Sequence, residues 1–361
     1  MKKTIIAAAA LSACMSTVAA QTSITIYGIV DAGITHVRND GPAGERTTVD
    51  PSQMQVSRWG FRGTEKLGGG LSARFGLEGT LSNDTGGAGT STGTPGTTSL
   101  FDRQATVGLV GTFGAVDVGR QNNLGIVAIS LADPIGLAFA ATSPNIRHAV
   151  LNHGGVYGAY GANNGGNALR QNNSIRYTSP LFNGVGFSLM RGFGEQAGQS
   201  QRSSYQGVAA SYTAGALGVA GSLSRLKNAT NTDLLKSNTF GVKYTLPALV
   251  LKSTYAQNEF EGSGRKISVF GAGVDMPVAP ALTLTGAFYN TRRSGDLRDD
   301  SQQYLLITRY ALSKRSTAYA SYGHIATDSN VATAQINLAE GIVAVGSDSA
   351  HRFTVGVMHL F

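Results

Sequence analysis

The sequence predicts an all-β protein, a transmembrane antiparallel β-barrel of sixteen strands. Its last segment, 349–361, alternates, with Phe353, Val355, Val357, His359 and Phe361 on one face. Segments of about ten alternating residues recur along the chain, separated alternately by short and long polar gaps. Charged residues make up only 14% of the chain, against about 25% in soluble domains. No internal apolar run approaches the ~20 residues that a membrane helix needs.

A chain that ends on a strand leaves an unpaired sheet edge, and closing the sheet into a barrel removes that edge. In lipid, a closed barrel is also the β structure that satisfies every backbone polar group. The alternative, a soluble sandwich of many strands, predicts more charge and no regular rhythm of short and long gaps. We therefore expect short turns at one end of the barrel and long loops at the other.

The predicted strands number sixteen, an even number, as in bacterial single-chain barrels. They are 23–37, 53–66, 71–83, 100–111, 115–120, 169–179, 185–195, 204–213, 217–227, 236–246, 249–260, 265–276, 282–292, 302–312, 315–327 and 349–361.

The first twenty residues have the features of a signal peptide. Lys2 and Lys3 precede an apolar stretch, and Val18-Ala19-Ala20 offers a cleavage site before Gln21. Residues 1–20 are thus expected to be removed, leaving 21–361 as a single barrel domain. Leu11 to Cys14 also fits a lipoprotein box, which would make an acylated Cys14 the first residue. Because Cys14 is the single cysteine, a chain cleaved before Gln21 has no disulfide.

The charge pattern does not indicate a nucleic-acid partner. The formal net charge is +8, and without Lys2 and Lys3 the 27 basic residues exceed the 21 acidic ones by six. There is no run of lysines and arginines; the arginines stand singly on alternating segments.

Six motifs resemble those of a known family, and they occur in order along the chain. They are 27–33 (YGIVDAG), 57–65 (SRWGFRGTE), 103–109 (RQATVGL), 118–121 (VGRQ), 176–180 (RYTSP) and 355–361 (VGVMHLF). Together they resemble the general porins of Gram-negative outer membranes, a trimeric family. The resemblance implies an outer-membrane homotrimer of sixteen-stranded barrels, surrounded by membrane lipid and lipopolysaccharide, that passes small hydrophilic solutes and ions.

In that family the loop after the fifth strand folds into the barrel and narrows it. Here that loop is 121–168, the longest gap in the chain. The residues of this loop support the same prediction, because Ile126, Ile129, Leu131 and Ile135 are too apolar for a loop in water. The alternative is an outer loop that packs on itself.

The resemblance also implies a constriction in which wall arginines face acids on the infolded loop. The matching wall positions are Arg58, Arg103 and Arg170, with Arg62, Arg120 and Arg176 nearby, and the matching loop acid is Asp133. A second loop acid, usual in cation-preferring relatives, falls on Leu137 by spacing. One acid against three arginines predicts weak selectivity or a preference for anions.

No residue pattern indicates an enzyme, a cofactor or a metal site. His148 and His153 are five residues apart with no carboxylate between them, which disfavours a metal site. The function expected is a general diffusion channel. An anion-preferring or solute-specific channel, a surface structural barrel or adhesin, and a barrel enzyme remain open as alternatives.

Overall fold

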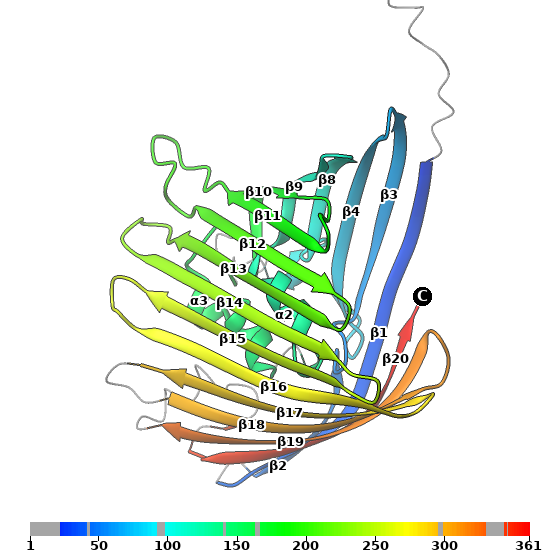
Figure 1. Ribbon diagram of the computed structural model, residues 1–361. Coiled ribbons are helices and arrows are strands. Elements are labelled where there is room, and N and C mark those ends of the chain that lie inside the picture. The colour runs from blue at the N-terminus through cyan, green and yellow to red at the C-terminus, as the bar shows by residue number, and fades with distance from the viewer. Residues whose placement is uncertain are drawn as a thin grey trace, which may run out of the picture.

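The chain folds into a closed antiparallel β-barrel of sixteen strands, as the sequence predicts (Figure 1). The computed structural model describes residues 22–41, 44–91, 98–139, 142–162, 167–294, 299–329, 343–344 and 346–361. The barrel strands are β1 (Thr22–Asn39), β3 (Arg58–Gly68), β4 (Leu71–Ser82), β8 (Gln104–Gly111), β9 (Gly114–Asn122), β10 (Arg170–Thr178), β11 (Val185–Gly192), β12 (Tyr205–Ala214), β13 (Leu217–Lys227), β14 (Leu234–Thr245), β15 (Val250–Phe260), β16 (Lys266–Ala279), β17 (Leu282–Arg293), β18 (Asp299–Ala311), β19 (Ser316–Ser329) and β20 (Ser349–Leu360).

The first and last strands close the barrel. β1 pairs with β20 from Ile29 opposite Leu360 to Asn39 opposite Ala350. The pairing continues to the last residue, because the backbone N–H of Phe361 donates to the Gly28 carbonyl at 3.1 Å and Gly28 N–H donates back to Phe361 at 3.1 Å. The terminal strand therefore leaves no open edge.

Alternation sorts the side chains onto two faces, as predicted for a barrel in lipid. On β20 the outward side chains of Val355 and Val357 are 66% and 51% exposed. On β1 the outward side chains of Ile24 and Ile34 are 64% and 61% exposed. The inward side chain of Thr354, next to Val355, is polar and buried. An apolar belt thus surrounds the barrel, and polar side chains point into its interior.

One predicted strand differs from the structure. The sequence predicts a polar gap over 38–52 and a strand over 53–66, whereas the structure has a strand β2 (Glu45–Pro51) and starts β3 at Arg58. β2 pairs with one part of β1 and β3 pairs with the other part, so β2 and β3 together occupy a single strand position in the wall. The ladder breaks between them because the Asp31 carboxylate accepts the backbone N–H of Gln55 at 2.7 Å.

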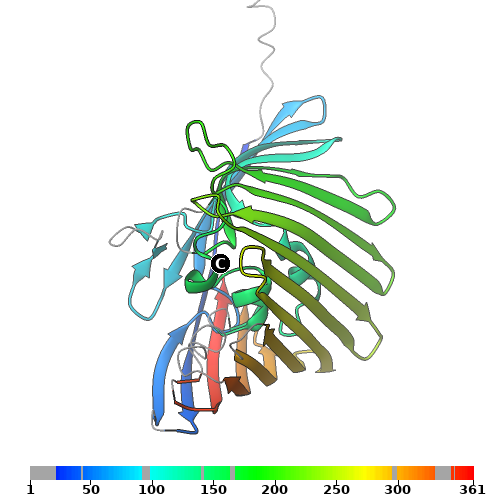
Figure 2. The ribbon, with the colours of Figure 1, turned by 90° about the vertical axis from the view of Figure 1, so that its left-hand side faces the viewer.

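The remaining strands are short. β5 (Gly87–Ala88) extends the sheet beside β4, and β6 (Thr90–Ser91) pairs with β7 (Thr98–Ser99). Figure 2 shows this segment standing away from the barrel wall. The predicted signal peptide 1–20 and the alternative lipidation of Cys14 lie outside the described residues. In the described part of the chain, no helix has the length and apolarity needed to cross a membrane.

Candidate functional site

The segment between β9 and β10 folds into the barrel interior. It carries α2 (Gly125–Ala132), the short helix η1 (Asn145–Ala149) and α3 (Gly154–Tyr157); we call residues 123–169 the inner loop. α2 contacts β12–β15, and η1 contacts β15 and β16. Figures 1 and 2 show the helices enclosed by the strands. The predicted infolding is therefore confirmed.

The inner loop is attached to the wall by buried apolar side chains and by hydrogen bonds. Ile129 and Ile135, which the sequence marks as too apolar for water, are fully buried. The backbone N–H of Leu124 donates to the Tyr205 hydroxyl at 2.9 Å. At the other end, the Asn258 amide donates to the His148 carbonyl at 2.8 Å. These contacts hold the inner loop against the part of the wall formed by β12–β16.

Glycines in the wall let the inner loop approach closely. A Cβ at Gly241 of β14 would lie 2.5 Å from the carbonyl oxygen of Ala128 in α2. A Cβ at Gly273 of β16 would lie 2.8 Å from Pro134. Since ordinary carbon contacts are about 3.5–4.0 Å long, any side chain at these two positions would push the loop away.

The three predicted wall arginines meet at one cavity of about 590 Å³ in the lumen, which we call the central cavity. Arg58, Arg103 and Arg170 line it, and Ile126 and Leu137 of the inner loop line it too. The structure thus brings the three arginines together beside the inner loop.

The acid Glu78 on β4, which the sequence did not single out, contacts two of these arginines, Arg58 and Arg103. Its carboxylate lies 2.6 Å from Arg103 Nε and 3.5 Å from Arg58 Nε. It also accepts a hydrogen bond from the Tyr27 hydroxyl at 3.0 Å. Gly60 stands opposite Glu78 in the β3–β4 ladder. A Cβ at Gly60 would lie 3.0 Å from the Tyr27 ring. Because Gly60 has no side chain, the Tyr27 ring can lie beside Glu78.

Further charged residues line the central cavity. Arg46 and Asp50 come from β2, and Arg352 comes from β20. Arg352 lies 4.0 Å from Asp50, and its guanidinium is 4.9 Å from the centre of the Phe139 ring on the inner loop. In all, five arginines face two carboxylates, a formal excess of three positive charges. The sequence predicts the direction of this excess but misses two of the five arginines.

The weaker arginine candidates lie elsewhere. Arg176 lines a smaller adjoining cavity of about 190 Å³ and lies 3.6 Å from Asp117. Arg62 stacks over the Tyr27 ring at 5.0 Å. Arg120 donates through Nε to the Asp102 carbonyl at 2.6 Å and lines neither cavity.

Asp133 does not take the place expected for it, because the structure does not bring it to the arginines. Its carboxylate is buried between the inner loop and the wall. It accepts hydrogen bonds from Asn145 Nδ2 at 2.6 Å, Leu137 N–H at 2.7 Å and the Tyr289 hydroxyl at 3.0 Å. Burial raises the pKa of the Asp133 carboxyl, while the hydrogen bonds from Asn145 and Leu137 lower it. This carboxylate holds the loop in place.

Two other wall acids, Asp31 and Asp117, also point inward but are already engaged. Asp31 accepts a hydrogen bond from the Tyr319 hydroxyl at 2.6 Å. Asp117 accepts one from Arg74 Nε at 2.8 Å. Neither lines the central cavity. In the described residues, no group of three histidine, cysteine, aspartate or glutamate side chains is placed to hold a metal ion.

Asp133→Asn is therefore expected to disturb the loop more than the charge of the lumen. An asparagine oxygen cannot accept all three donors, and each buried donor left unpaired costs about 1–3 kcal/mol. We expect more open-channel noise in planar bilayers and a smaller shift of the reversal potential than Glu78→Gln produces. A shift as large as that of Glu78→Gln would show that the charge of Asp133 reaches the lumen.

A closed membrane barrel, narrowed by an infolded loop and lined by arginines, defines a class of outer-membrane channel. Comparisons with known proteins agree. The sequence model of the Gram-negative porin family matches residues 7–330. Outer membrane porin protein 32 of Delftia acidovorans is 31% identical over 380 residues, covering 100% of both chains. The chain belongs to the Gram-negative porin family, whose members are non-enzymatic channels, and is a diffusion channel of the outer membrane.

Two solved structures have a similar fold. An anion-selective porin from Comamonas acidovorans superposes with a TM-score of 0.78 at 26% identity, covering 94% of this chain and 100% of that one. The trimer form of OmpT from Vibrio cholerae superposes with a TM-score of 0.66 at 15% identity, covering 94% of this chain and 99% of that one. Porins of this family are typically trimeric.

Proposed function

We propose that this porin is a general diffusion channel for small hydrophilic solutes with a modest preference for anions. The observation that carries the proposal is the central cavity, where Arg46, Arg58, Arg103, Arg170 and Arg352 face two carboxylates. The similarity to an anion-selective porin supports the same direction.

The physical argument rests on where the charges stand. Fixed charges beside a narrow, water-filled opening act strongly on a passing ion, because the low-dielectric walls focus the field. Arginine keeps its charge at any relevant pH. The Glu78 carboxylate offsets part of the field of Arg58 and Arg103, so the preference is modest.

We also propose that the functional unit is a homotrimer. The family is typically trimeric, and a trimer form occurs among the similar structures. The β6–β7 hairpin, which stands away from the barrel wall in Figure 2, is suited to contact a neighbouring subunit.

Liposome swelling tests general diffusion and charge preference together. Proteoliposomes should swell in isosmotic glucose, and faster in gluconate than in glucosamine, which are an anion and a cation of similar size. The swelling rate should not saturate with solute concentration, as expected for diffusion without a binding site. No swelling in any of the three solutes, or faster entry of glucosamine than of gluconate, would contradict the proposal.

A further inference from the structure

Two histidines face each other on the outer surface of the barrel, beside the seam at which the first and last strands close. His324 of β19 stands directly opposite His351 of β20 in the sheet register. Their ring centres are 4.6 Å apart, and the ring planes are tilted by 32°. Alternation places both rings on the outside, because their chain neighbours Ile325 and Ala350 are buried. The two imidazoles therefore form a cross-strand pair that the pore does not use.

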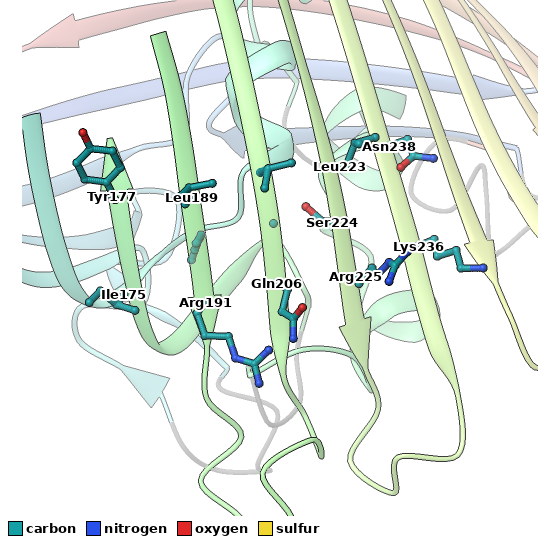
Figure 3. A pocket seen from close by; sticks show the side chains of 13 residues that line it. Ile175, Tyr177, Leu189, Arg191, Gln206, Leu223, Ser224, Arg225, Lys236 and Asn238 are labelled. Atoms are coloured by element: carbon teal, nitrogen blue, oxygen red, sulfur yellow. The ribbon is translucent and has the colours of Figure 1, made fainter. Parts of the chain in front are cut away.

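This pair lies at the polar rim of the barrel rather than in its apolar belt. Its two strands are joined by residues 330–348, and in outer-membrane barrels the longer connections face outward. Figure 3 shows the same change of polarity on β13, where the apolar Leu223 is followed by Arg225, two residues nearer the end with the longer connections. On β20 the exposed Phe353 and His351 follow each other in the same way. The side chain of His351 is 33% exposed, so an ion can reach it from water.

Asp40, just beyond the end of β1, brings a carboxylate to the pair. Its Oδ2 lies 3.7 Å from His351 Nε2. This distance is too long for a hydrogen bond, but two ligands about 2.1 Å from a tetrahedral zinc ion stand about 3.4 Å apart. The Ser349 hydroxyl donates a hydrogen bond to the same carboxylate. That hydrogen bond holds the pKa of the Asp40 carboxyl below its ordinary value, so the group is ionised at neutral pH.

The residues around the pair favour a metal ligand on the exposed side of His351. The Tyr322 hydroxyl lies 2.9 Å from His351 Nδ1. A proton on Nδ1, donated to this hydroxyl, leaves the lone pair on Nε2, the atom nearer the carboxylate. In the described part of the chain, no hydrogen bond holds Nδ1 of His324, so this ring can turn. The charge of Arg38, which stands opposite His351 on β1, is offset by Glu45 at 3.7 Å.

We propose that His324, His351 and Asp40 bind a divalent transition-metal ion of the Zn²⁺ type at the outer rim of the barrel. Two imidazole nitrogens and one carboxylate oxygen are a ligand set that zinc accepts, with water in the fourth position. The three groups do not yet surround a common centre, so the ion draws the His324 ring and the carboxylate inwards by side-chain rotation. The ligands come from β19, β20 and the end of β1, so the bound ion joins the strands of the closing seam.

Isothermal titration calorimetry with Zn²⁺ tests the site on the purified porin, without a histidine tag, in detergent micelles. The wild type should bind one Zn²⁺ per chain. His324→Ala combined with His351→Ala should weaken binding by about a hundredfold or more, because loss of an outer-shell partner alone costs about 10–100-fold. The matched control, His36→Ala with His359→Ala, removes two other histidines, which bond to Thr47 and Ser316, and should bind like the wild type.

Further measurements separate this site from general cation binding at the rim. Asp40→Asn should weaken Zn²⁺ binding by about tenfold or more, because a neutral amide replaces the carboxylate ligand. Saturating Zn²⁺ should raise the unfolding temperature of the wild type but not of the double histidine variant, since the ion binds the folded seam. Mg²⁺ in about hundredfold excess should not displace Zn²⁺, because Mg²⁺ prefers oxygen ligands.

Three results would overturn the proposal. The first is wild-type affinity in the double histidine variant or in Asp40→Asn. The second is displacement of Zn²⁺ by Mg²⁺, which would indicate a site made of oxygen atoms alone. The third is the absence of Zn²⁺ binding by the wild type.

Discussion

Replacing both Arg103 and Arg170 with serine is expected to swing the channel from anion preference towards cations. The double variant leaves Arg46, Arg58 and Arg352 facing Asp50 and Glu78, and it removes the 2.6 Å partner of Glu78. One unit charge about 4 Å from an ion is worth about 1 kcal/mol in water, or roughly fivefold in ion concentration. Two charges should therefore change the anion-to-cation permeability ratio by roughly tenfold or more at low salt.

The matched control for this prediction is Arg191→Ser with Arg225→Ser. It removes the same formal charge from the outward face and should leave the reversal potential almost unchanged. The conductance of the Arg103→Ser, Arg170→Ser channel should also rise, because two bulky side chains leave the central cavity. The shift should shrink at 1 M salt, where the screening length is about 3 Å. Equal reversal potentials for this variant and the wild type would refute the assignment of these arginines.

Gly241→Ala is expected to displace the inner loop. The new Cβ would lie 2.5 Å from the Ala128 carbonyl and 3.0 Å from the Ala132 Cβ, so α2 must move away from β14 by about 1 Å. Overpacking of this kind costs about 1–3 kcal/mol. We expect a lower unfolding temperature and, because α2 moves into the lumen, a smaller single-channel conductance.

The control for Gly241→Ala lies one strand away against the same helix. A Cβ at Gly218 of β13 would meet only the end of the Leu131 side chain, at 3.3 Å, which can turn aside. Gly218→Ala should therefore keep the wild-type conductance and unfolding temperature. Equal conductances and unfolding temperatures for Gly218→Ala and Gly241→Ala would contradict the claim that the close contact at Gly241 determines the position of the inner loop.

The barrel and its inner loop were predictable because the signals are local. Alternation is visible within one strand, as in Val355 and Val357. The apolar residues of 126–139 indicate that this segment is buried away from water. The place of Gln53 to Ser57 was not predictable, because the break there depends on Asp31, which reaches across from another strand. A contact between two strands leaves no trace in the alternation of either one.

Only part of the candidate site could be predicted from the sequence. The family motifs indicate Arg58, Arg103 and Arg170, and the structure brings these together. Glu78 was missed because its neighbours depend on the register that sets it opposite Gly60. Asp133 was expected in the lumen because its spacing places it on the loop, but spacing does not say which side of the loop meets the wall. That choice depends on hydrogen bonds from two residues. Tyr289 is far away in the sequence, and Asn145 is brought next to Asp133 by the fold of the inner loop.

The most direct test of the account is the reversal potential of the wild-type channel across a potassium chloride gradient. The five arginines and two carboxylates of the central cavity predict a potential of the sign set by chloride, modest in size at about 0.1 M and smaller near 1 M. A potential of the sign set by potassium, persisting as the salt is lowered, would contradict the central claim that the arginines govern which ions pass.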